Sequence, residues 1–317
     1  MQENEFWNRY ALRQSMSYPW AMSTSDASLQ AEDYGPCNWG RWGDDDERGT
    51  LNLITPDLVM AAVRLVRRGV VVPLGASFGP DGPIAPVRDR TWHIVRYRLG
   101  PLTGVAEDVL ITNTHAGTHV DALSHALLKG RMYNGFEVSE HVTSSGITRN
   151  AISNVRAIVG RGVLLDVARH RGVDHLEMGD VIGPEELDEC ARRAGVTLGQ
   201  GDICLVRTGW YRLFETDRKR FDEGWPGLSY RAATWFHERG LAALGADTCA
   251  VDVIPGEDGV RPYGLHPRII NQQGGYLIEY LDLEELATQR TPEFLFVAAP
   301  LVIEGAAGSP INPLAIL

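Results

Sequence analysis

The stretch HAGTHVDALSH, residues 115–125, gathers three of the nine histidines of the chain and one aspartate. Imidazole nitrogens and carboxylate oxygens bind Zn²⁺, Mn²⁺ and Fe²⁺, and histidine also transfers protons near neutral pH. On an extended strand alternate side chains project to one side, because the side-chain period is two. In this stretch the residues that would project to the same side are His115, Gly117, His119 and Asp121. A helix would turn Asp121 away from the two histidines, so the spacing predicts an extended segment with metal ligands on one face.

The remaining residues of the stretch suggest how water and a proton are handled. Gly117 has no side chain, so we expect room between the two imidazoles for an ion and its water. The sequence DALSHALL is compatible with a helix that places His125 one turn from Asp121, facing the same centre. A bound divalent ion lowers the pKa of its water and polarises a carbonyl group, and a nearby histidine can carry the proton. This chemistry is typical of hydrolysis.

Composition restricts the class of partner. The 317 residues carry a formal net charge of -11, which repels polyphosphates, so nucleic acid is not expected as a partner. The sequence contains no run of 18 apolar residues, so no membrane-spanning helix is expected. The first residues, MQENEFWNRYALRQSM, lack the apolar core of a signal peptide. The four cysteines form no CxxC pair, which favours free thiols and a cytoplasmic location. The expected partner is a small-molecule substrate.

The elements that must position these residues alternate along the chain. Thr55 and Pro56 mark a helix start, with apolar positions repeating to Val66, and further helices are expected over 183–196, 229–240 and 282–289, with a short one from Pro267. Strands are expected over 70–78, 91–99, 162–168, 202–210, 242–253, 275–281 and 294–303. Interleaved strands and helices predict the α/β class. We expect one domain over 36–317, preceded by an extension over 1–35.

The pattern HxGTHxDxxxH resembles the signature of the metal-dependent cyclase family, which includes kynurenine formamidase and isatin hydrolase. The blocks NWGRWGDDDERGTLN, GVLLDVARHRGV, GDICLVRTGW, LGADTCAVDVIP and FLFVAAPLVIEGAAGSPINPLAI are similar to those of its longer members, of about 300 residues. The resemblance implies a compact mixed-sheet domain of the swivelling β/β/α type. It also implies assembly as a homodimer or homotetramer.

The resemblance further implies roles for individual residues. His115, His119 and Asp121 would hold one Zn²⁺ or Mn²⁺ ion. In members with two ions, a distant histidine and glutamate complete the site, and LHPRIINQQGGYLIEYL supplies them as His266 and Glu279. Asp121 and Glu279 would then bridge two ions, whereas other relatives work with a single manganese. His125 matches the proton donor and acceptor of the formamidase.

Three residues are candidates for substrate binding. Trp39 and Trp42, flanked by glycines, are candidates for a flat wall against a ring-bearing substrate, and surface anchoring is the alternative. Arg207, at the end of a predicted strand, suits a substrate carboxylate or an oxyanion, and a structural ion pair is the alternative.

Together these features predict a divalent-metal-dependent hydrolase that opens an amide, imide or ester (lactone) bond in a cyclic or aromatic small molecule. Water activated by the metal attacks the carbonyl, and His125 shuttles the proton. One rival is a mononuclear Fe²⁺ oxygenase, because His119, Asp121 and His266 spell a two-histidine, one-carboxylate triad. The other is a metal-binding scaffold without catalysis.

Overall fold

A computed structural model describes residues 34–257 and 262–317. Residues Gly35–Leu317 form one compact unit. The predicted extension over 1–35 lies almost entirely outside the described residues, so the boundary at residue 35 stays a prediction. In the part of the chain that the structure describes, no helix has both the length and the apolar character needed to cross a membrane.

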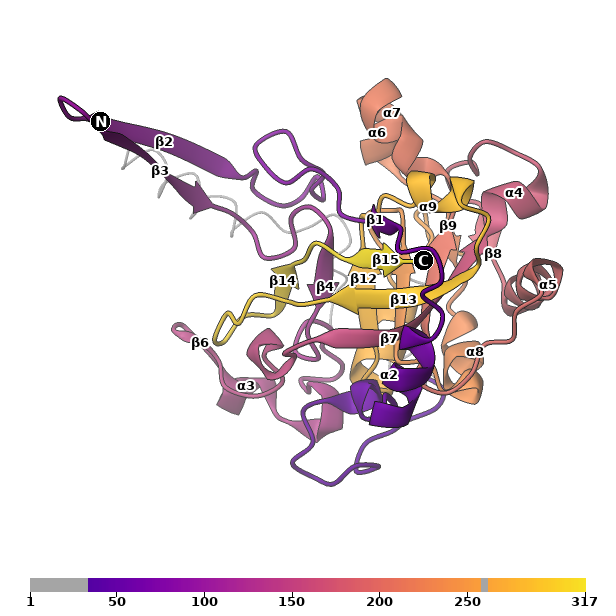
Figure 1. The fold of residues 1–317 in the computed structure, drawn as a ribbon. Coiled ribbons are helices and arrows are strands. Elements are labelled where there is room, and N and C mark those ends of the chain that lie inside the picture. The colour runs from indigo at the N-terminus through magenta and orange to yellow at the C-terminus, as the bar shows by residue number, and fades with distance from the viewer. Residues whose placement is uncertain (1–33, 258–261) are drawn as a thin grey trace. The chain divides into compact units, whose positions relative to one another are not determined.

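Nine strands of the described residues form one mixed sheet (Figure 1). Its order is β1-β15-β13-β7-β9-β11-β12-β4-β14. The central strands β7, β9, β11 and β12 run parallel, and β4 is antiparallel to both of its neighbours, β12 and β14. Their bounds are β1 Val71–Pro73, β4 His119–Asp121, β7 Ile158–Asp166, β9 Ile203–Arg207, β11 Ala243–Ala246, β12 Tyr276–Glu279, β13 Glu293–Ala298, β14 Gly308–Pro310 and β15 Leu314–Ile316. This sheet confirms the predicted mixed α/β class.

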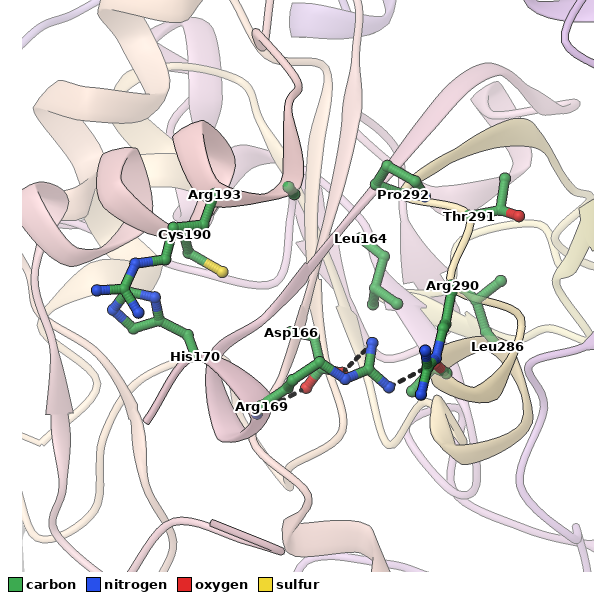
Figure 2. A pocket seen from close by; sticks show the side chains of 12 residues that line it. Leu164, Asp166, Arg169, His170, Cys190, Arg193, Leu286, Arg290, Thr291 and Pro292 are labelled. Atoms are coloured by element: carbon green, nitrogen blue, oxygen red, sulfur yellow. Dashed lines mark hydrogen bonds and ion pairs between the residues drawn. The ribbon is translucent and has the colours of Figure 1, made fainter. Parts of the chain in front are cut away.

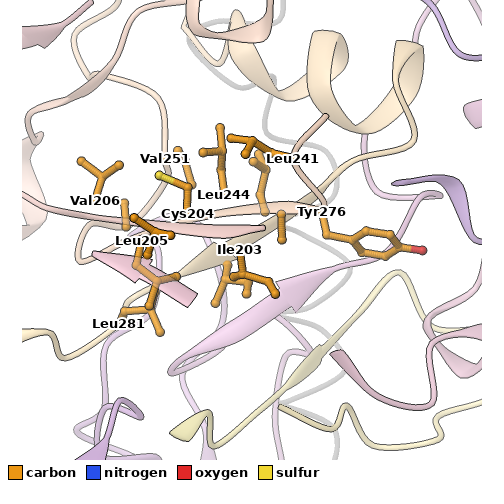
Figure 3. Close-up of a cluster of buried hydrophobic side chains, with 14 of the residues drawn as sticks. Ile203, Cys204, Leu205, Val206, Leu241, Leu244, Val251, Tyr276 and Leu281 are labelled. Atoms are coloured by element: carbon orange, nitrogen blue, oxygen red, sulfur yellow. The ribbon is translucent and has the colours of Figure 1, made fainter. Parts of the chain in front are cut away.

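The hydrophobic core is built on the parallel strands. Every residue of β9, β11 and β12 is buried, and their sequences ICLVR, ALGA and YLIE are nearly continuous apolar runs. Such runs are expected where a parallel sheet is covered on both faces. Figure 3 shows side chains of Ile203, Leu205 and Leu244 packed within this core. Glu279, one of the candidate metal ligands, is the last residue of β12.

Four of the α-helices in the described residues match expected helices and differ from them at their ends, and the other four were not expected. They are α2 Pro56–Val63, α3 Val138–His141, α4 Val167–Arg171, α5 Pro184–Ala194, α6 Leu213–Thr216, α7 Arg218–Glu223, α8 Ala232–Arg239 and α9 Glu284–Thr288. Short helical turns are η2 Gly49–Leu53, η3 Tyr133–Gly135, η4 Ile152–Asn154, η5 Trp210–Arg212 and η6 Pro267–Gln272, which is π-helical. Thr55 caps α2 by accepting a hydrogen bond from Leu58 N. This helix ends before Val66, because the next amides bond to the carbonyl three residues back and tighten the chain into turns.

Several strands are shorter than their sequence patterns predict. The apolar run over 70–78 pairs only over Val71–Pro73, and Pro73 has no amide hydrogen to extend the ladder. The run over 242–253 leaves the sheet after Ala246, because Asp247 turns to accept hydrogen bonds from the backbone of Thr208 and Gly209.

A two-stranded hairpin stands apart from the main sheet. It pairs β2 (Trp92–Leu99) with β3 (Gly104–Ile111) over the full length of both strands. Figure 1 shows it projecting away from the sheet. The strand over 91–99 was expected, whereas β3 was not. Two further small sheets pair β5 (Val142–Thr143) with β6 (Gly146–Ile147), and β8 (Val181–Ile182) with β10 (Gly227–Leu228).

Candidate metal centre

The centre is built around the short strand β4, which lies between β12 and β14. Its residues His119 and Asp121 share one face and are fully buried, while Val120 points to the other. The register places Glu279 of β12 opposite His119, and Gly308 of β14 opposite Asp121. Strand pairing therefore brings together residues that lie about 160 and 190 positions apart in the sequence, as β4, β12 and β14 align.

The segment before β4 is a turn, which corrects the prediction of an extended strand from residue 115. Gly117 has φ +62°, a left-handed conformation that glycine adopts without strain. A β-carbon there would meet Phe78 at 2.9 Å, so Gly117 does not provide the gap between the imidazoles that was expected. Its carbonyl instead accepts a hydrogen bond from His119 Nδ1 at 2.9 Å. The turn brings the His115 side chain back to the face of Asp121.

His125 reaches the centre by a turn as well, and the predicted helix over DALSHALL does not form. The His125 amide donates to the Ala122 carbonyl at 2.9 Å. The imidazole packs on His115, with ring centroids 4.1 Å apart. Its side chain is 24% exposed, whereas Asp121 is fully buried. His125 is thus the histidine on the open side of the cluster.

The distant pair joins the cluster as the family resemblance implied. His266 caps the N-terminus of the turn η6, and its Nε2 lies 3.1 Å from Glu279 Oε1 and 3.7 Å from Asp121 Oδ2. The other ring nitrogen, Nδ1, lies 2.5 Å from Asp252 Oδ2, and Asp252 Oδ1 accepts the amide of Leu265 at 2.6 Å. Asp252 was missed in the sequence, because no spacing rule links it to His266. A carboxylate on the far nitrogen fixes the direction in which the imidazole presents its lone pair.

The polar atoms converge on Asp121. Its Oδ1 lies 3.3 Å from His115 Nε2, 3.7 Å from His119 Nε2 and 3.9 Å from His125 Nε2. Glu279 Oε2 lies 3.1 Å from His119 Nε2. Two sets of ligand atoms each fit within 4.8 Å: one from His115, Asp121 and His125, the other from Asp121, His266 and Glu279. Asp121 belongs to both sets, an arrangement that suits a carboxylate between two ions.

Burial and neighbouring charges tune the centre. Burial lowers the pKa of His115 and lowers that of His125 to about 3, so both imidazoles are neutral at pH 7. Burial and the charge of Asp121 raise the pKa of Glu279, but the adjacent imidazoles of His119 and His266 prevail and bring it to about 2. Neutral imidazoles and ionised carboxylates are the forms that bind a cation. His266 differs from His115 and His125: burial lowers its pKa, but the carboxylates of Asp252 and Glu279 prevail and raise it well above the usual value, so an ion that binds there must displace a proton.

The donor set fits a divalent cation. Among the described residues, His115 Nε2, His119 Nε2 and both carboxylate oxygens of Asp121 are buried without a hydrogen-bond partner. Buried polar atoms are rarely left unpaired, and here four of them point to one place. Gly308 keeps that place open, because a β-carbon there would lie 2.7 Å from His115 Nε2. Histidine nitrogens with carboxylate oxygens match the preferences of Zn²⁺ and Mn²⁺.

The three residues proposed for substrate binding make other contacts. Trp39 Nε1 donates to the Asn271 carbonyl at 2.7 Å, and Arg41 lies over the ring of Trp42. Arg207 is buried between Asp166 and Glu284, with nitrogen–oxygen distances of 2.8 Å to each. These contacts favour the structural alternative for Arg207. None of them reaches the cluster around Asp121, so the substrate-binding roles stay predictions.

A separate cavity of about 550 Å³ opens beyond the end of β7, between α4, α5 and α9 (Figure 2). Asp166 and Arg169 lie on its wall, hydrogen-bonded to each other. Its apolar part is formed by Leu164, Cys190 and Leu286. None of the lining residues belongs to the histidine and carboxylate cluster, so this cavity is distinct from the candidate metal centre.

Comparison with solved structures finds close relatives of the fold. A structure described as a novel cyclase is 32% identical, with a TM-score of 0.82, and the match covers 89% of this chain and all of that one. An isatin hydrolase bound to the product analogue thioisatinate is 20% identical, with a TM-score of 0.59, covering 83% of this chain and 99% of that one. Isatin hydrolase A from Ralstonia solanacearum is 24% identical, with a TM-score of 0.56, and the match covers 82% of this chain and 95% of that one. The latter two show likeness of fold.

No curated protein matches the sequence. The Cyclase family model does match, over residues 45–253, which is more than half of the chain and includes the whole stretch from His115 to His125. The histidine and aspartate spacing, the mixed sheet that presents it and the family match agree, and this chain belongs to the cyclase family.

Proposed function

We propose that this chain is a divalent-metal-dependent hydrolase that opens an amide, imide or ester (lactone) bond in a cyclic or aromatic small molecule. The observation that carries the proposal is the group of four buried, unpaired donor atoms on His115, His119 and Asp121. The names of the isatin hydrolases with the same fold support the choice of a hydrolytic reaction on a ring.

Five residues would hold the metal: His115, His119, Asp121, His266 and Glu279. A divalent ion bound there supplies a Lewis acid for a carbonyl oxygen and lowers the pKa of water. Hydrogen bonds from His119 Nδ1 to Gly117 O, and between His266 Nδ1 and Asp252, aim the Nε2 atoms inward. The protein thereby prepares the ligand directions before any ion arrives.

His125 is the residue that we propose to move the proton. Its imidazole is neutral at pH 7 and partly exposed, and its Nε2 lies 3.9 Å from Asp121 Oδ1. A neutral imidazole accepts a proton from the attacking water and returns it to the leaving nitrogen or oxygen. Because His125 also falls within one of the two candidate ligand sets, its role must be tested separately from metal binding.

The test combines metal analysis with a hydrolysis screen. Protein purified without chelators is expected to contain Zn²⁺ or Mn²⁺ and to hydrolyse at least one of a panel of lactones, cyclic imides, isatin and formyl-anilides, followed with a pH indicator. His125→Ala should retain the metal and lose turnover, whereas His141→Ala, outside the cluster, should retain both. Loss of metal from His125→Ala would make it a ligand. A metal-loaded protein inactive on the whole panel would contradict the hydrolase proposal, and dependence on oxygen would favour the Fe²⁺ oxygenase.

A further inference from the structure

The cavity of Figure 2, between α4, α5 and α9, gathers positive charge on an acidic protein. Arg169, Arg193 and Arg290 line it, and Asp166 is the one carboxylate among the described residues of its wall. Arg207 lies outside the lining and pairs with Asp166 at 2.8 Å, so that carboxylate is already balanced. The whole chain, by contrast, has 41 acidic and 30 basic residues. The cavity is therefore a local excess of cations, which attracts an anion.

The arginines of the cavity keep hydrogen-bond donors available for a ligand. The guanidinium of Arg290 makes no hydrogen bond or ion pair with another described residue. Arg193 uses its Nε to donate to Glu189 at 2.9 Å, and its two terminal nitrogens have no hydrogen-bond partner among the described residues. Arg169 donates to the Ala287 carbonyl through one terminal nitrogen, and its side chain is 54% exposed. Each guanidinium carries five N–H donors in a planar fork, which matches the oxygens of a carboxylate or a phosphate.

The floor of the cavity is apolar and has the size of a small-molecule pocket. Leu164, Cys190 and Leu286 form it, together with Ala194 and Ala287. Figure 2 shows the sulfur of Cys190 pointing into the space between the helices. The volume of about 550 Å³ falls within the range of about 300–1,000 Å³ that is usual for ligand pockets. An apolar floor beneath arginine side chains suits a ligand with an apolar body and an anionic group.

The position of the cavity in the sheet is also one where ligands bind. Asp166 is the last residue of β7, and ligands of parallel sheets commonly lie beyond the carboxyl ends of the strands. Glu279 of the candidate metal centre ends β12 at the same edge, with β9 and β11 between. Three strand spacings of about 4.8 Å put the two places on the order of 15 Å apart. A small ligand in the cavity therefore does not reach the metal centre.

We propose that this cavity is a second binding site, for a small organic oxyanion. The carboxylate or phosphate of the ligand binds Arg290 and the other lining arginines, and its ring or short chain lies on the apolar floor. This inference rests on the charge, free donors, floor and position of the cavity and does not depend on a metal or on hydrolysis. Its failure would leave the proposed function intact.

The test is a calorimetric titration of the full chain, as purified, at low salt. Benzoate, phenylacetate and phenyl phosphate are compared with neutral phenylacetamide and with inorganic phosphate. At least one aromatic anion is expected to bind at least about tenfold more tightly than phenylacetamide, which lacks the charge, and than inorganic phosphate, which lacks the apolar body. The aromatic anions also distinguish a carboxylate ligand from a phosphate ester. Absence of binding by all three at about 10 mM, or equal binding of either comparison compound, overturns the proposal.

Arg290→Gly removes the guanidinium without risk to the fold. Arg290 follows α9 with φ +54°, a left-handed conformation that glycine adopts without strain and that commonly ends a helix. The variant should therefore unfold in urea at the same midpoint as the wild type and bind the anion at least about tenfold more weakly. Arg192→Gln is the control, because Arg192 precedes Arg193 on α5 but does not line the cavity, and it should keep the wild-type affinity.

Chelation separates this cavity from the candidate metal centre. Binding in the cavity should survive treatment of the protein with EDTA and weaken in Arg290→Gly. An anion that binds only to a metal ion would be released by EDTA and would keep its affinity in Arg290→Gly. That second pair of results, for every anion that binds, overturns the proposal.

Discussion

Substitution of Gly308 by alanine is expected to weaken metal binding while leaving the fold intact. Gly308 pairs with Asp121 across β14 and β4, and its φ is not in the left-handed region, so alanine is compatible with the backbone there. The new β-carbon would lie 2.7 Å from His115 Nε2. Both strands are held in the sheet, so the ring of His115 must move.

The size of that movement follows from the geometry. Ordinary contact begins at 3.4 Å, so the imidazole must retreat from 2.7 Å by about 0.7 Å. Binding sites tolerate misplacement of about 0.5 Å. Mutation of a residue that hydrogen-bonds a metal ligand costs about 10–100-fold in metal affinity, or about 1.4–2.7 kcal/mol. We expect a loss of the same size here, because displacement of His115 also spoils the alignment of one ligand.

The free energy of unfolding of the metal-free protein should change by less than about 1 kcal/mol, because the far end of one side chain absorbs the strain and alanine restricts the unfolded chain. Zn²⁺ affinity is measured by competition with a chromophoric chelator, and stability by urea unfolding in the presence of EDTA. Gly199→Ala is the control, since a β-carbon at Gly199 meets nothing within 4 Å. Wild-type Zn²⁺ affinity in Gly308→Ala would refute the assignment of His115 as a ligand.

Three further outcomes are expected. Asp252→Asn should lower Zn²⁺ affinity about 10–100-fold. An asparagine amide that donates to His266 Nδ1 moves the ring proton to Nε2, the nitrogen that faces the metal. Equal affinity of the variant and the wild type in the competition assay would show that Asp252 does not position His266. Arg207→Met should lower the free energy of unfolding by about 3–5 kcal/mol in urea, because Asp166 and Glu284 lose their buried partner, and it should leave Zn²⁺ affinity unchanged. Chelation of protein held at a free metal concentration about 100 times the dissociation constant should cost about 2.7 kcal/mol of stability, visible as a lower Tm, and an unchanged Tm would contradict a resident metal.

The sequence predicted the membership of the cluster better than its geometry. His119 and Asp121 alternate on β4 as a strand requires, so a local rule was enough for them. His115 and His125 also reach the cluster, but through turns, because Gly117 is left-handed and the residues after Asp121 do not form a helix. A turn and a strand can deliver the same side chains to one point, and spacing alone does not tell them apart.

Other features depend on pairing between distant segments. Asp252 meets His266 only because the chain folds back over 14 residues, and the role of Gly308 exists only when β14 lies beside β4. Strand β3 was missed because adjacent charges at Glu107 and Asp108 interrupt the alternation that marks a half-buried strand, and both faces of the hairpin of β2 and β3 are exposed. No short stretch of sequence indicates which distant strands will pair or in which register. The order of helices and strands can be predicted locally, because each apolar run indicates one element.

The position of β4 between β12 and β14 has a consequence for biosynthesis. Residues 119–121 leave the ribosome long before residues 276–279 and 308–310, which flank them in the finished sheet. Contacts between such distant segments form slowly, because the intervening chain must first be ordered. A nascent chain therefore displays the histidines near residue 120 without the strand that holds Glu279 or the glycine that leaves His115 its space. We therefore expect the centre to become complete only when β12 and β14 have paired with β4.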